Sequence, residues 1–412
     1  MKIHIVGSIY RKCHMRLFII LMAVAALTST SLHAAKKDQS AVMTDELFAA
    51  MKLRSIGPAY MSGRIADIEV DTKNPSVWYI AVGSGGVWKT VNAGITWIPI
   101  FDKQAVFSTG DVTIDPSNSN IIWVGTGENN GGRHLSFGDG VYKSLDGGET
   151  WKNKGLNESE HISDIIVHPQ DSNTIWVSSQ GPLWSKGGER GLFKTTDGGE
   201  TWTNVLETDE WTGVTSLVID STNPDKLYAA TWQRQRTLPA FVGTGPGSAI
   251  HTSEDGGETW RKLTNGLPEA DMGKIGLAIS KLDPDVVYAA IELNQRKGGV
   301  YRSANQGASW EKMSDEVGGG TGPHYYQEMF ADPHRFDRIY MVSNYSKYSD
   351  DGGKTWTPFN LKNKHVDDHA MAFHPTDKNF MLVGSDGGVY ETRDDMKKWR
   401  FQGNLPIAQF YK

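Results

Sequence analysis

Ser144-Leu-Asp-Gly-Gly-Glu-Thr-Trp151 is one of four nearly identical octapeptides in this chain. The other three occupy residues 195–202, 253–260 and 349–356, and weaker copies lie at 90–97, 303–310 and 392–399. Their terminal tryptophans are separated by 54, 51, 58, 50, 46 and 43 residues. Repeats of roughly 40–50 residues with four strands each are typical of β-propeller blades, so the seven copies predict an all-β, seven-bladed propeller.

Each repeat carries the same succession of strand and turn patterns. In the first repeat, residues 65–70 alternate as a strand does, a turn at 71–75 ends in proline, and a second strand follows at 77–82. A glycine-rich loop at 83–86 leads to a third strand at 87–90, and the box turn then connects to a fourth strand at 96–100. The pattern predicts four antiparallel strands per blade, with the blades filling residues 61–402.

The repeated box is predicted to stabilise the fold rather than to act on a ligand. Its aspartate is placed to accept hydrogen bonds from turn amides, and its glycines supply left-handed backbone. Its tryptophan offers a large flat surface that can cover the junction between neighbouring sheets. A catalytic group is not needed seven times in one chain, so we assign structural roles to Asp146, Asp197, Asp255, Asp351, Trp151, Trp202, Trp260, Trp310 and Trp356.

Composition excludes several classes of protein. The 412 residues include 42 Lys and Arg against 48 Asp and Glu, a formal net charge of −6. Since no basic excess is present to neutralise phosphates, nucleic acid is not an expected partner. Hydrophobic residues make up 38% of the chain, and its 45 glycines follow no three-residue period, which excludes a disordered or collagen-like chain.

The N-terminus has the pattern of a signal peptide. Basic residues at 11, 12 and 16 precede an apolar run at 17–27, which is too short to span a bilayer, and small residues follow at 34 and 35. We expect residues 1–35 to be removed on export to a secreted or periplasmic location, with translation starting at Met1 or Met15. The only cysteine, Cys13, lies within that segment, so the mature chain would have no thiol and no membrane span. Residues 36–60 are expected to contain a short helix.

The box is similar to the Asp-box of sialidases, sortilin-type sorting receptors and family 74 glycoside hydrolases. Other stretches resemble bacterial secreted proteins with sortilin N-terminal-domain-like (BNR) repeats, namely 53–58, 62–64, 84–89, 124–129, 140–143 and 365–369. The resemblance covers about residues 45–412. It implies that residues 403–412 begin a C-terminal region and that further domains follow Lys412.

Loop lengths predict which face of the propeller binds a ligand. The box turns and the proline turns share one face, here called the turn face, and stay short. Loops on the opposite face, here called the long-loop face, vary in length and include residues 126–137, 180–190, 232–247, 318–328 and 364–369. Variable loops on a rigid scaffold commonly form a binding surface.

Side chains of these loops suit a sugar polymer or an extended polypeptide. Aromatic faces provide flat apolar contact, and arginine forks donate paired hydrogen bonds to planar acceptors. The predicted ligand-binding residues are Arg133, Trp184, Trp232, Arg234, Tyr325 and Tyr326, and Phe137 and Arg190 belong to the same surface. The alternative is that many of these side chains pack the loops against one another.

Hydrolysis of a glycan would need two carboxylates about 5–10 Å apart across the scissile bond. The catalytic candidates are Glu128, Asp386 and Asp367, and the same face also carries Glu189, Glu328 and Asp368. In the family 74 enzymes that the chain resembles, a catalytic aspartate stands two positions before a Gly-Gly pair, and here that position holds Gly83. Their partner carboxylate belongs to a second propeller, so the resemblance favours binding over hydrolysis.

The segment His365-Val-Asp-Asp-His369 carries residue types that bind divalent cations. Residues four apart on a strand share a face but lie about 13 Å apart, so only a looped backbone would bring His365, Asp367 and His369 onto one ion. His134 and His324 of other long loops are further candidate ligands. Apart from such a cation, we expect no cofactor.

Taken together, these patterns predict a secreted or periplasmic propeller whose long-loop face binds a glycan or a polypeptide. Two alternatives stay open. One is a glycoside hydrolase of the xyloglucanase type, and the other is one half of a larger two-propeller protein that is inactive alone.

Overall fold

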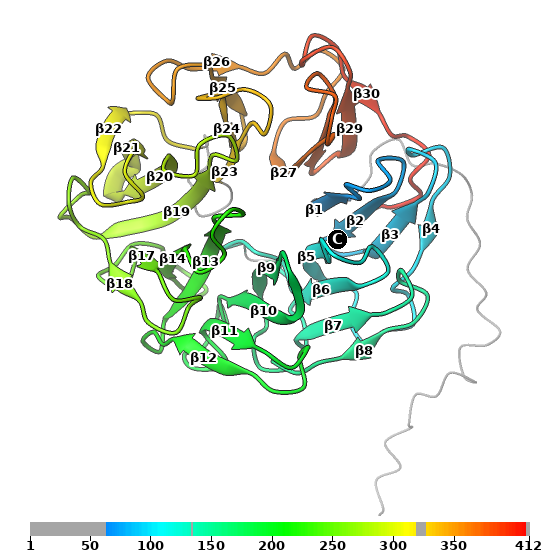
Figure 1. The fold of residues 1–412 in the computed structure, drawn as a ribbon, viewed down its shortest axis with the longest axis horizontal. Coiled ribbons are helices and arrows are strands. Elements are labelled where there is room, and N and C mark those ends of the chain that lie inside the picture. Colours follow the sequence, from blue (N-terminus) through cyan, green and yellow to red (C-terminus); the bar gives the residue numbers. More distant parts are fainter. Residues whose placement is uncertain (1–62, 133–134, 319–326, 409–412) are drawn as a thin grey trace, which may run out of the picture. The chain divides into compact units, whose positions relative to one another are not determined.

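Seven four-stranded antiparallel sheets surround a central axis in the computed structural model of the chain (Figure 1). The structure describes residues 63–132, 135–318 and 327–408. The prediction of an all-β, seven-bladed propeller is confirmed. The predicted signal peptide (1–35), the segment 36–60 with its predicted helix, and residues 409–412 lie outside the described residues. Within the part that is described, no helix is long and apolar enough to cross a membrane.

Each blade takes its strands in chain order, interrupted only in blade four by a short hairpin, and its first strand lies nearest the axis. Blade one comprises β1 (Ile65–Val70), β2 (Trp78–Val82), β3 (Gly86–Thr90) and β4 (Ile98–Pro99). Blade two comprises β5 (Thr109–Ile114), β6 (Ile122–Thr126), β7 (Val141–Ser144) and β8 (Lys152–Asn153). Blade three comprises β9 (Ile162–His168), β10 (Asp171–Ser179), β11 (Gly191–Thr195) and β12 (Thr203–Leu206). Blade four comprises β13 (Thr212–Ile219), β14 (Leu227–Gln233), β17 (Ala249–Ser253) and β18 (Arg261–Lys262), and its long loop adds a hairpin of β15 (Gln235–Arg236) and β16 (Phe241–Val242).

Blades five to seven complete the ring. Blade five comprises β19 (Met272–Ile279), β20 (Val287–Leu293), β21 (Lys297–Ser303) and β22 (Glu311–Ser314). Blade six comprises β23 (Glu328–Ala331), β24 (Ile339–Val342), β25 (Lys347–Ser349) and β26 (Thr357–Pro358). Blade seven comprises β27 (Asp368–Phe373), β28 (Met381–Ser385), β29 (Gly388–Thr392) and β30 (Arg400–Phe401). A single 3-10 turn, η1 (Asn294–Arg296), joins β20 to β21.

The hydrophobic core lies between neighbouring blades rather than inside any one of them. Second strands are buried on both faces, as the continuous burial of β2 shows. One cluster joins Tyr79 and Ala81 of blade one to Val112 and Ile122 of blade two. Because a single sheet has no core of its own, each blade depends on its neighbours for stability.

The repeated box closes the turn between the third and fourth strands through one carboxylate. Asp146 accepts hydrogen bonds from the hydroxyl of Ser144 (2.7 Å) and from the amide (2.9 Å) and hydroxyl (2.6 Å) of Thr150. These hydrogen bonds, those from Thr150 first, lower the pKa of Asp146 from 3.8 to about 2. The following Trp151 donates from Nε1 to the carbonyl of Ile100 in the preceding blade (2.7 Å). The box therefore fixes its own turn and also contacts the adjacent sheet.

The ring closes between blades one and seven, where β1 packs beside β27. After β30 the chain crosses to blade one, and Asn404 Nδ2 donates to the carbonyls of Gly94 and Ile95 (both 2.9 Å). Leu405 and Ile407 join a buried cluster that holds residues of both blades. The first part of the predicted C-terminal region is therefore part of the propeller closure.

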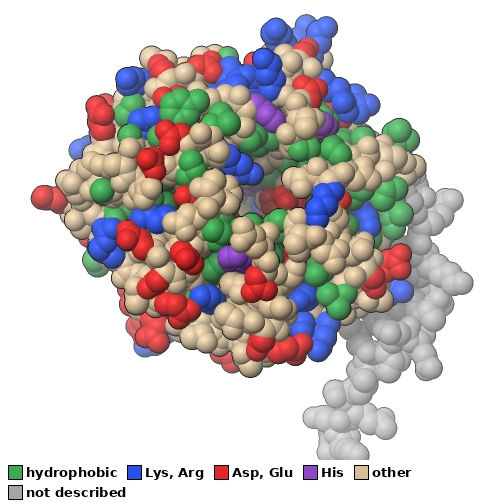
Figure 2. All heavy atoms as spheres, viewed as in Figure 1, with side chains coloured by type: hydrophobic (Ala, Val, Ile, Leu, Met, Phe, Trp, Pro, Cys, Tyr) green, Lys and Arg blue, Asp and Glu red, His purple; other side chains and the backbone are tan. Residues whose placement is uncertain are grey.

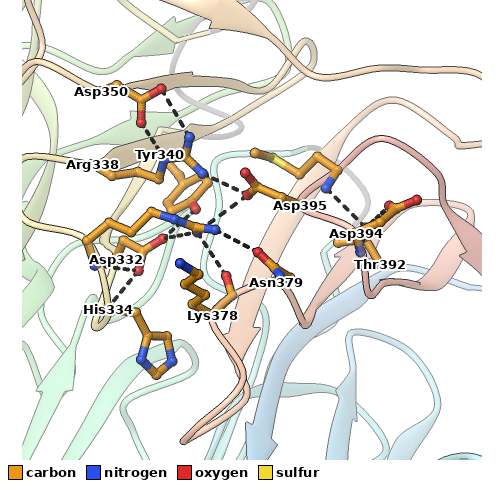
Figure 3. A network of polar contacts seen from close by, with 12 residues as sticks. Asp332, His334, Arg338, Tyr340, Asp350, Lys378, Asn379, Thr392, Asp394 and Asp395 are labelled. Atoms are coloured by element: carbon orange, nitrogen blue, oxygen red, sulfur yellow. Dashed lines mark hydrogen bonds and ion pairs between the residues drawn. The ribbon is translucent and has the colours of Figure 1, made fainter.

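An ionic network on the turn face ties blade six to blade seven (Figure 3). Arg338 donates to both carboxylate oxygens of Asp350 and, through Nη1, to Asp395 of blade seven (2.7 Å). Nearby, the hydroxyl of Tyr340 donates to Asp332 at 2.8 Å. Since the Arg338 side chain is almost fully buried, this network is a structural lock between two sheets.

Candidate functional site

Buried arginines fasten the long loops of blades two, three and four together. Arg190 donates through Nη1 to the carbonyl of Gln180 (2.6 Å) and through Nε to that of Gly187 (2.8 Å). Arg236 donates from Nε to the carbonyl of Gly131 in blade two (2.7 Å), and Arg234 donates to the neighbouring carbonyl of Asn130. A guanidinium group satisfies several backbone carbonyls at once, so it suits loops that lack regular pairing.

Two residues predicted to bind ligand therefore have a different role. Arg234 and Trp232 are each 1% exposed, so neither offers a surface to a ligand. Trp232 donates from Nε1 to Gly243 (2.9 Å) and packs edge-on against Phe241. This corrects the prediction for Trp232 and Arg234 and supports the alternative of loop packing. Arg133, Tyr325 and Tyr326, and the candidate ligands His134 and His324, lie outside the described residues.

The fastened loops present large aromatic side chains to solvent. Trp184 is 43% exposed and Phe137 is 66% exposed. The structure adds Phe107, which is 59% exposed and sits beside the long loop of blade two. The hydroxyl of Ser108 donates to the carbonyl of Ser136 (2.9 Å), which holds the backbones next to Phe107 and Phe137 together.

A charged cluster lies where blades one, two and seven meet at the long-loop face. Arg64, just before β1, donates from Nη1 to Glu128 Oε2 (2.5 Å) and from Nε to Asp386 Oδ1 (2.8 Å). The same oxygen of Asp386 contacts His369 Nε2 at 2.8 Å. The structure therefore brings together two of the predicted catalytic candidates, Glu128 and Asp386, through an arginine that sequence reasoning did not single out.

The two carboxylates of this cluster differ in accessibility. Glu128 is 1% exposed, whereas Asp386 is 28% exposed. Burial favours the neutral form of Asp386, but the hydrogen bond from His369 and the charge of Arg64 outweigh it and hold the pKa of Asp386 well below its ordinary value. Burial lowers the pKa of His369, so its ring is neutral near pH 7 and can donate to this carboxylate. Asp386 is thus an ionised group with contact to solvent.

Gly83 faces Glu128 across the same cluster. A Cβ atom built on Gly83 would lie 2.6 Å from Cδ of Glu128, closer than any real contact of this kind. The carboxyl of Glu128 also lies near the hydroxyl of Ser84 (3.4 Å) and the amide of Asn130 (3.2 Å). The space of a side chain at position 83 is therefore filled by a carboxyl from the next blade.

A small polar hollow of about 110 Å³ opens beside this cluster at the axis. It is lined by Arg64, Glu128 and His369 and by acidic residues of the innermost strands, namely Asp67, Asp111, Asp164 and Glu328. Figure 2 shows one face of the molecule, hollowed at its centre with acidic, basic and apolar side chains around the opening. The amount of room suits a few water molecules better than a whole sugar ring.

Burial favours the protonated form of several of these inner carboxyls. It raises the pKa of Asp67 from 3.8 to about 6, and it raises the pKa values of Asp111 and Asp164 well above the ordinary value. Oδ2 of Asp67 and of Asp164 each accept a hydrogen bond from the backbone of the following blade (both 3.1 Å). Glu328 instead pairs with the buried Lys274 at 2.6 Å. The innermost strands thus combine proton-carrying groups with contacts between blades.

Sequence reasoning missed three of these inner carboxyls and named only Glu328, although a signal was present. Asp67, Asp111 and Asp164 each stand four residues before the residue that opens a proline turn. The equivalent position in blade six holds Glu328, and in blade four it holds Ser216. Aligning the repeats on their proline turns would have placed these polar residues at one level of the axis.

The structure does not gather the candidate metal ligands around one point. His365 Nδ1 contacts the carbonyl of Val366, the carboxylate of Asp367 accepts from Asn344, and His369 contacts Asp386. Among residues 63–132, 135–318 and 327–408, no group of three His, Cys, Asp or Glu side chains is arranged to hold a metal ion. Asp367 therefore fixes a loop here, and Asp368 is buried in an ion pair with Lys364.

Comparisons with known proteins identify relatives of this fold. The profile of the Sortilin-Vps10 family, described as sortilin, neurotensin receptor 3, matches residues 139–295 and 298–404, which is more than half of the chain. A xyloglucanase of Hypocrea jecorina is 23% identical over 381 residues, covering 82% of this chain and 42% of its own length. A sialidase of Paraclostridium sordellii is 23% identical over 252 residues, covering 51% of this chain and 60% of its own length.

Solved structures share the architecture. The GH74 xyloglucanase from Xanthomonas campestris superposes with a TM-score of 0.63 at 16% identity, covering 85% of this chain and 56% of that one. YCF48 from Cyanidioschyzon merolae superposes with a TM-score of 0.54 at 16% identity, covering 84% of this chain and 99% of that one. At such identities the likeness establishes the fold alone. This chain spans less than half the length of the Hypocrea xyloglucanase.

Proposed function

The chain belongs to the Sortilin-Vps10 family, and we propose that its long-loop face binds a glycan chain. The observation that carries this proposal is the fastening of the long loops by buried arginines, which leaves Trp184, Phe137 and Phe107 exposed on a fixed surface. Curated relatives named as xyloglucanases support a sugar polymer over a polypeptide. The predicted signal peptide adds that this binding takes place outside the cytoplasm.

The physical basis is preorganisation. An aromatic ring packs its flat apolar face against the apolar face of a sugar, and it loses little conformational entropy when its loop is already fixed. Asp386, which is 28% exposed on the same face and held in place by the buried Arg64, supplies an acceptor for sugar hydroxyls. Shallow, open surfaces of this kind suit a long chain better than a small molecule.

Hydrolysis is the second candidate function, and one observation favours it. The carboxyl of Glu128 fills the space beside Gly83, the position at which the resemblance to family 74 implies a catalytic aspartate. A general acid and an ionised partner are both present in the region, since the pKa of Asp67 is about 6 and Asp386 is ionised. Against this candidate, Glu128 is buried against Arg64.

The test is a binding titration with the purified full chain and xyloglucan oligosaccharides. Trp184→Ala is expected to weaken binding by about tenfold, because it removes one stacking surface. Phe336→Ala is the matched control, since Phe336 is 47% exposed but lies in a proline turn on the turn face. Equal affinity of both variants and the unaltered chain would overturn the proposal, as would binding of extended peptides in place of sugars.

A product assay on the same samples separates binding from hydrolysis. New reducing ends that disappear in Asp386→Asn but persist in Phe336→Ala would establish the second candidate. Binding without product would leave the chain as a binding propeller. Because the chain spans less than half of the Hypocrea relative, this assay concerns the activity of this chain by itself.

A further inference from the structure

The turn face holds two hollows larger than the one beside the charged cluster, at the opposite end of the axis. Two adjoining hollows of about 440 Å³ and 580 Å³ are lined there by the ends of the innermost strands and the proline turns. They share Glu69, Val70, Thr72, Ile279 and Lys281. Hollows of this size fall in the range that binds small organic molecules.

Together the two hollows form the turn-face mouth of the axis. The wall of this mouth is a ring of seven side chains, one from each innermost strand. Each stands two residues before the residue that opens a proline turn. The ring consists of Glu69, Thr113, Ile166, Val218, Ala278, Phe330 and Ala372. Five members are apolar, and the hydroxyl of Thr113 is already committed to the carbonyl of Ile165 (2.9 Å). Glu69 is the one ionisable member of this ring.

Glu69 has no cationic partner in this wall. Throughout residues 63–132, 135–318 and 327–408, no lysine, arginine or histidine nitrogen lies within salt-bridge distance of its carboxylate. Lys281, whose charge lowers the pKa of Glu69, is an exposed side chain that lines the same hollows. A carboxyl in apolar surroundings gains much from a cation delivered to it, because the interaction is screened less than in water.

We propose that the turn-face mouth of the axis binds a small amphiphilic cation, that is, an ammonium group on an alkyl or aryl stem. The ammonium pairs with Glu69, and the stem packs against Ile166, Val218 and Phe330. Both parts are needed. A purely apolar molecule would leave the carboxyl without a cationic partner, and a bare cation would gain nothing from the apolar wall. This site lies on the other face from the proposed glycan surface and does not depend on it.

The protonation of Glu69 gives the proposal a second readout. Burial raises the pKa of Glu69 to about 8, so near pH 7 the free protein holds a proton there that an ammonium ligand must displace. Binding at pH 7 is therefore expected to release about one proton. The other titratable groups around the mouth are Asp67, Asp71, Asp115, Asp164, Asp220, Lys281, Glu328, His334 and His374.

The experiment compares two probes of equal length by calorimetry with the full chain. Octylammonium is expected to bind about tenfold more tightly than octanol, with proton release seen as a dependence of the heat on the buffer. Glu69→Gln should remove that preference and the proton release while leaving octanol binding unchanged. Glu207→Gln, an exposed carboxylate in the linker after β12, is the matched control and should change nothing.

A variant that narrows the turn-face mouth tests whether both probes bind there. Ala372→Leu adds volume to the same wall and should weaken both probes, with unfolding measured separately to confirm that the variant folds. Equal affinity for the two probes, or a preference for octylammonium that survives Glu69→Gln, would overturn the proposal. No binding of either probe to the unaltered chain would overturn it as well.

Discussion

Arg64 and Glu128 form a buried ion pair between two blades. Nη1 of Arg64 lies 2.5 Å from Oε2 of Glu128, and the two side chains are 3% and 1% exposed. Arg64 enters the first strand of blade one, and Glu128 follows the second strand of blade two. Glu128, which sequence reasoning offered as a catalytic candidate, is therefore part of the joint between neighbouring sheets.

Replacing Glu128 by glutamine should destabilise the fold. Breaking a buried ion pair costs about 3–5 kcal/mol, but glutamine still accepts a hydrogen bond and Asp386 still compensates Arg64, so we expect a loss of about 1–3 kcal/mol in the free energy of unfolding. Urea titration measures the loss. Glu210→Gln is the control, because Glu210 pairs with Lys186 where both are more than half exposed, and it should cost less than about 1 kcal/mol. Equal, small losses in both variants would contradict this account.

The inner carboxyls should make the propeller less stable as pH rises. Burial raises the pKa of Asp67 from 3.8 to about 6 and that of Glu69 from 4.5 to about 8, so the folded chain holds these protons more tightly than the unfolded chain does. The contribution of these protons to the free energy of unfolding is intact below about pH 4 and is lost between about pH 4 and pH 8. Asp67→Asn and Glu69→Gln should each flatten this fall in thermal unfolding temperature. If both variants keep the full slope, the carboxyls are not responsible for it.

The arginine contacts should control the order of the long loops. Arg234→Lys removes the fork that reaches the carbonyls of Asn130 and Gly181, so amide hydrogen exchange in residues 128–132 and 180–190 should speed up by about tenfold. Arg261→Lys, at a site 60% exposed, serves as the control and should leave exchange unchanged. Unaltered protection in the Arg234 variant would show that the loops hold their shape without it.

Closure of the ring should depend on the residues after the last strand. Leu405→Ala empties a site that is 2% exposed between blades one and seven, and we expect a loss of about 2–5 kcal/mol in the free energy of unfolding. Leu238→Ala, at a position 85% exposed, should cost less than about 0.5 kcal/mol. Urea titrations of the two variants give the comparison. A cost at Leu405 as small as that at Leu238 would mean that this segment does not close the ring.

The fold could be predicted from sequence because its signal is repeated in every blade. The box of Ser144–Trp151 specifies a turn locally, through contacts within eight residues, and its copies set the number of blades. Strand positions followed from the same repetition, as the match between the expected 65–70 strand and β1 shows. Local contacts of this kind can be derived from spacing alone.

The binding face was predicted less well, because loop length does not reveal packing. Trp232 and Arg234 have the chemistry of ligand-binding residues, but both are buried, Trp232 against Gly243 and Phe241 of its own loop and Arg234 against the loop of blade two. Trp184 belongs to the same class of residue and stays exposed. Which of these a loop buries depends on long-range contacts that no single repeat encodes.

The most direct test of the account is hydrogen exchange of the full chain with and without a xyloglucan oligosaccharide. We predict slower exchange in residues 105–110, 135–138 and 180–190, where Phe107, Phe137 and Trp184 lie on the long-loop face. Residues 332–338 on the turn face should be unaffected. Protection confined to the turn face, or no protection at a saturating concentration of the sugar, would contradict the account.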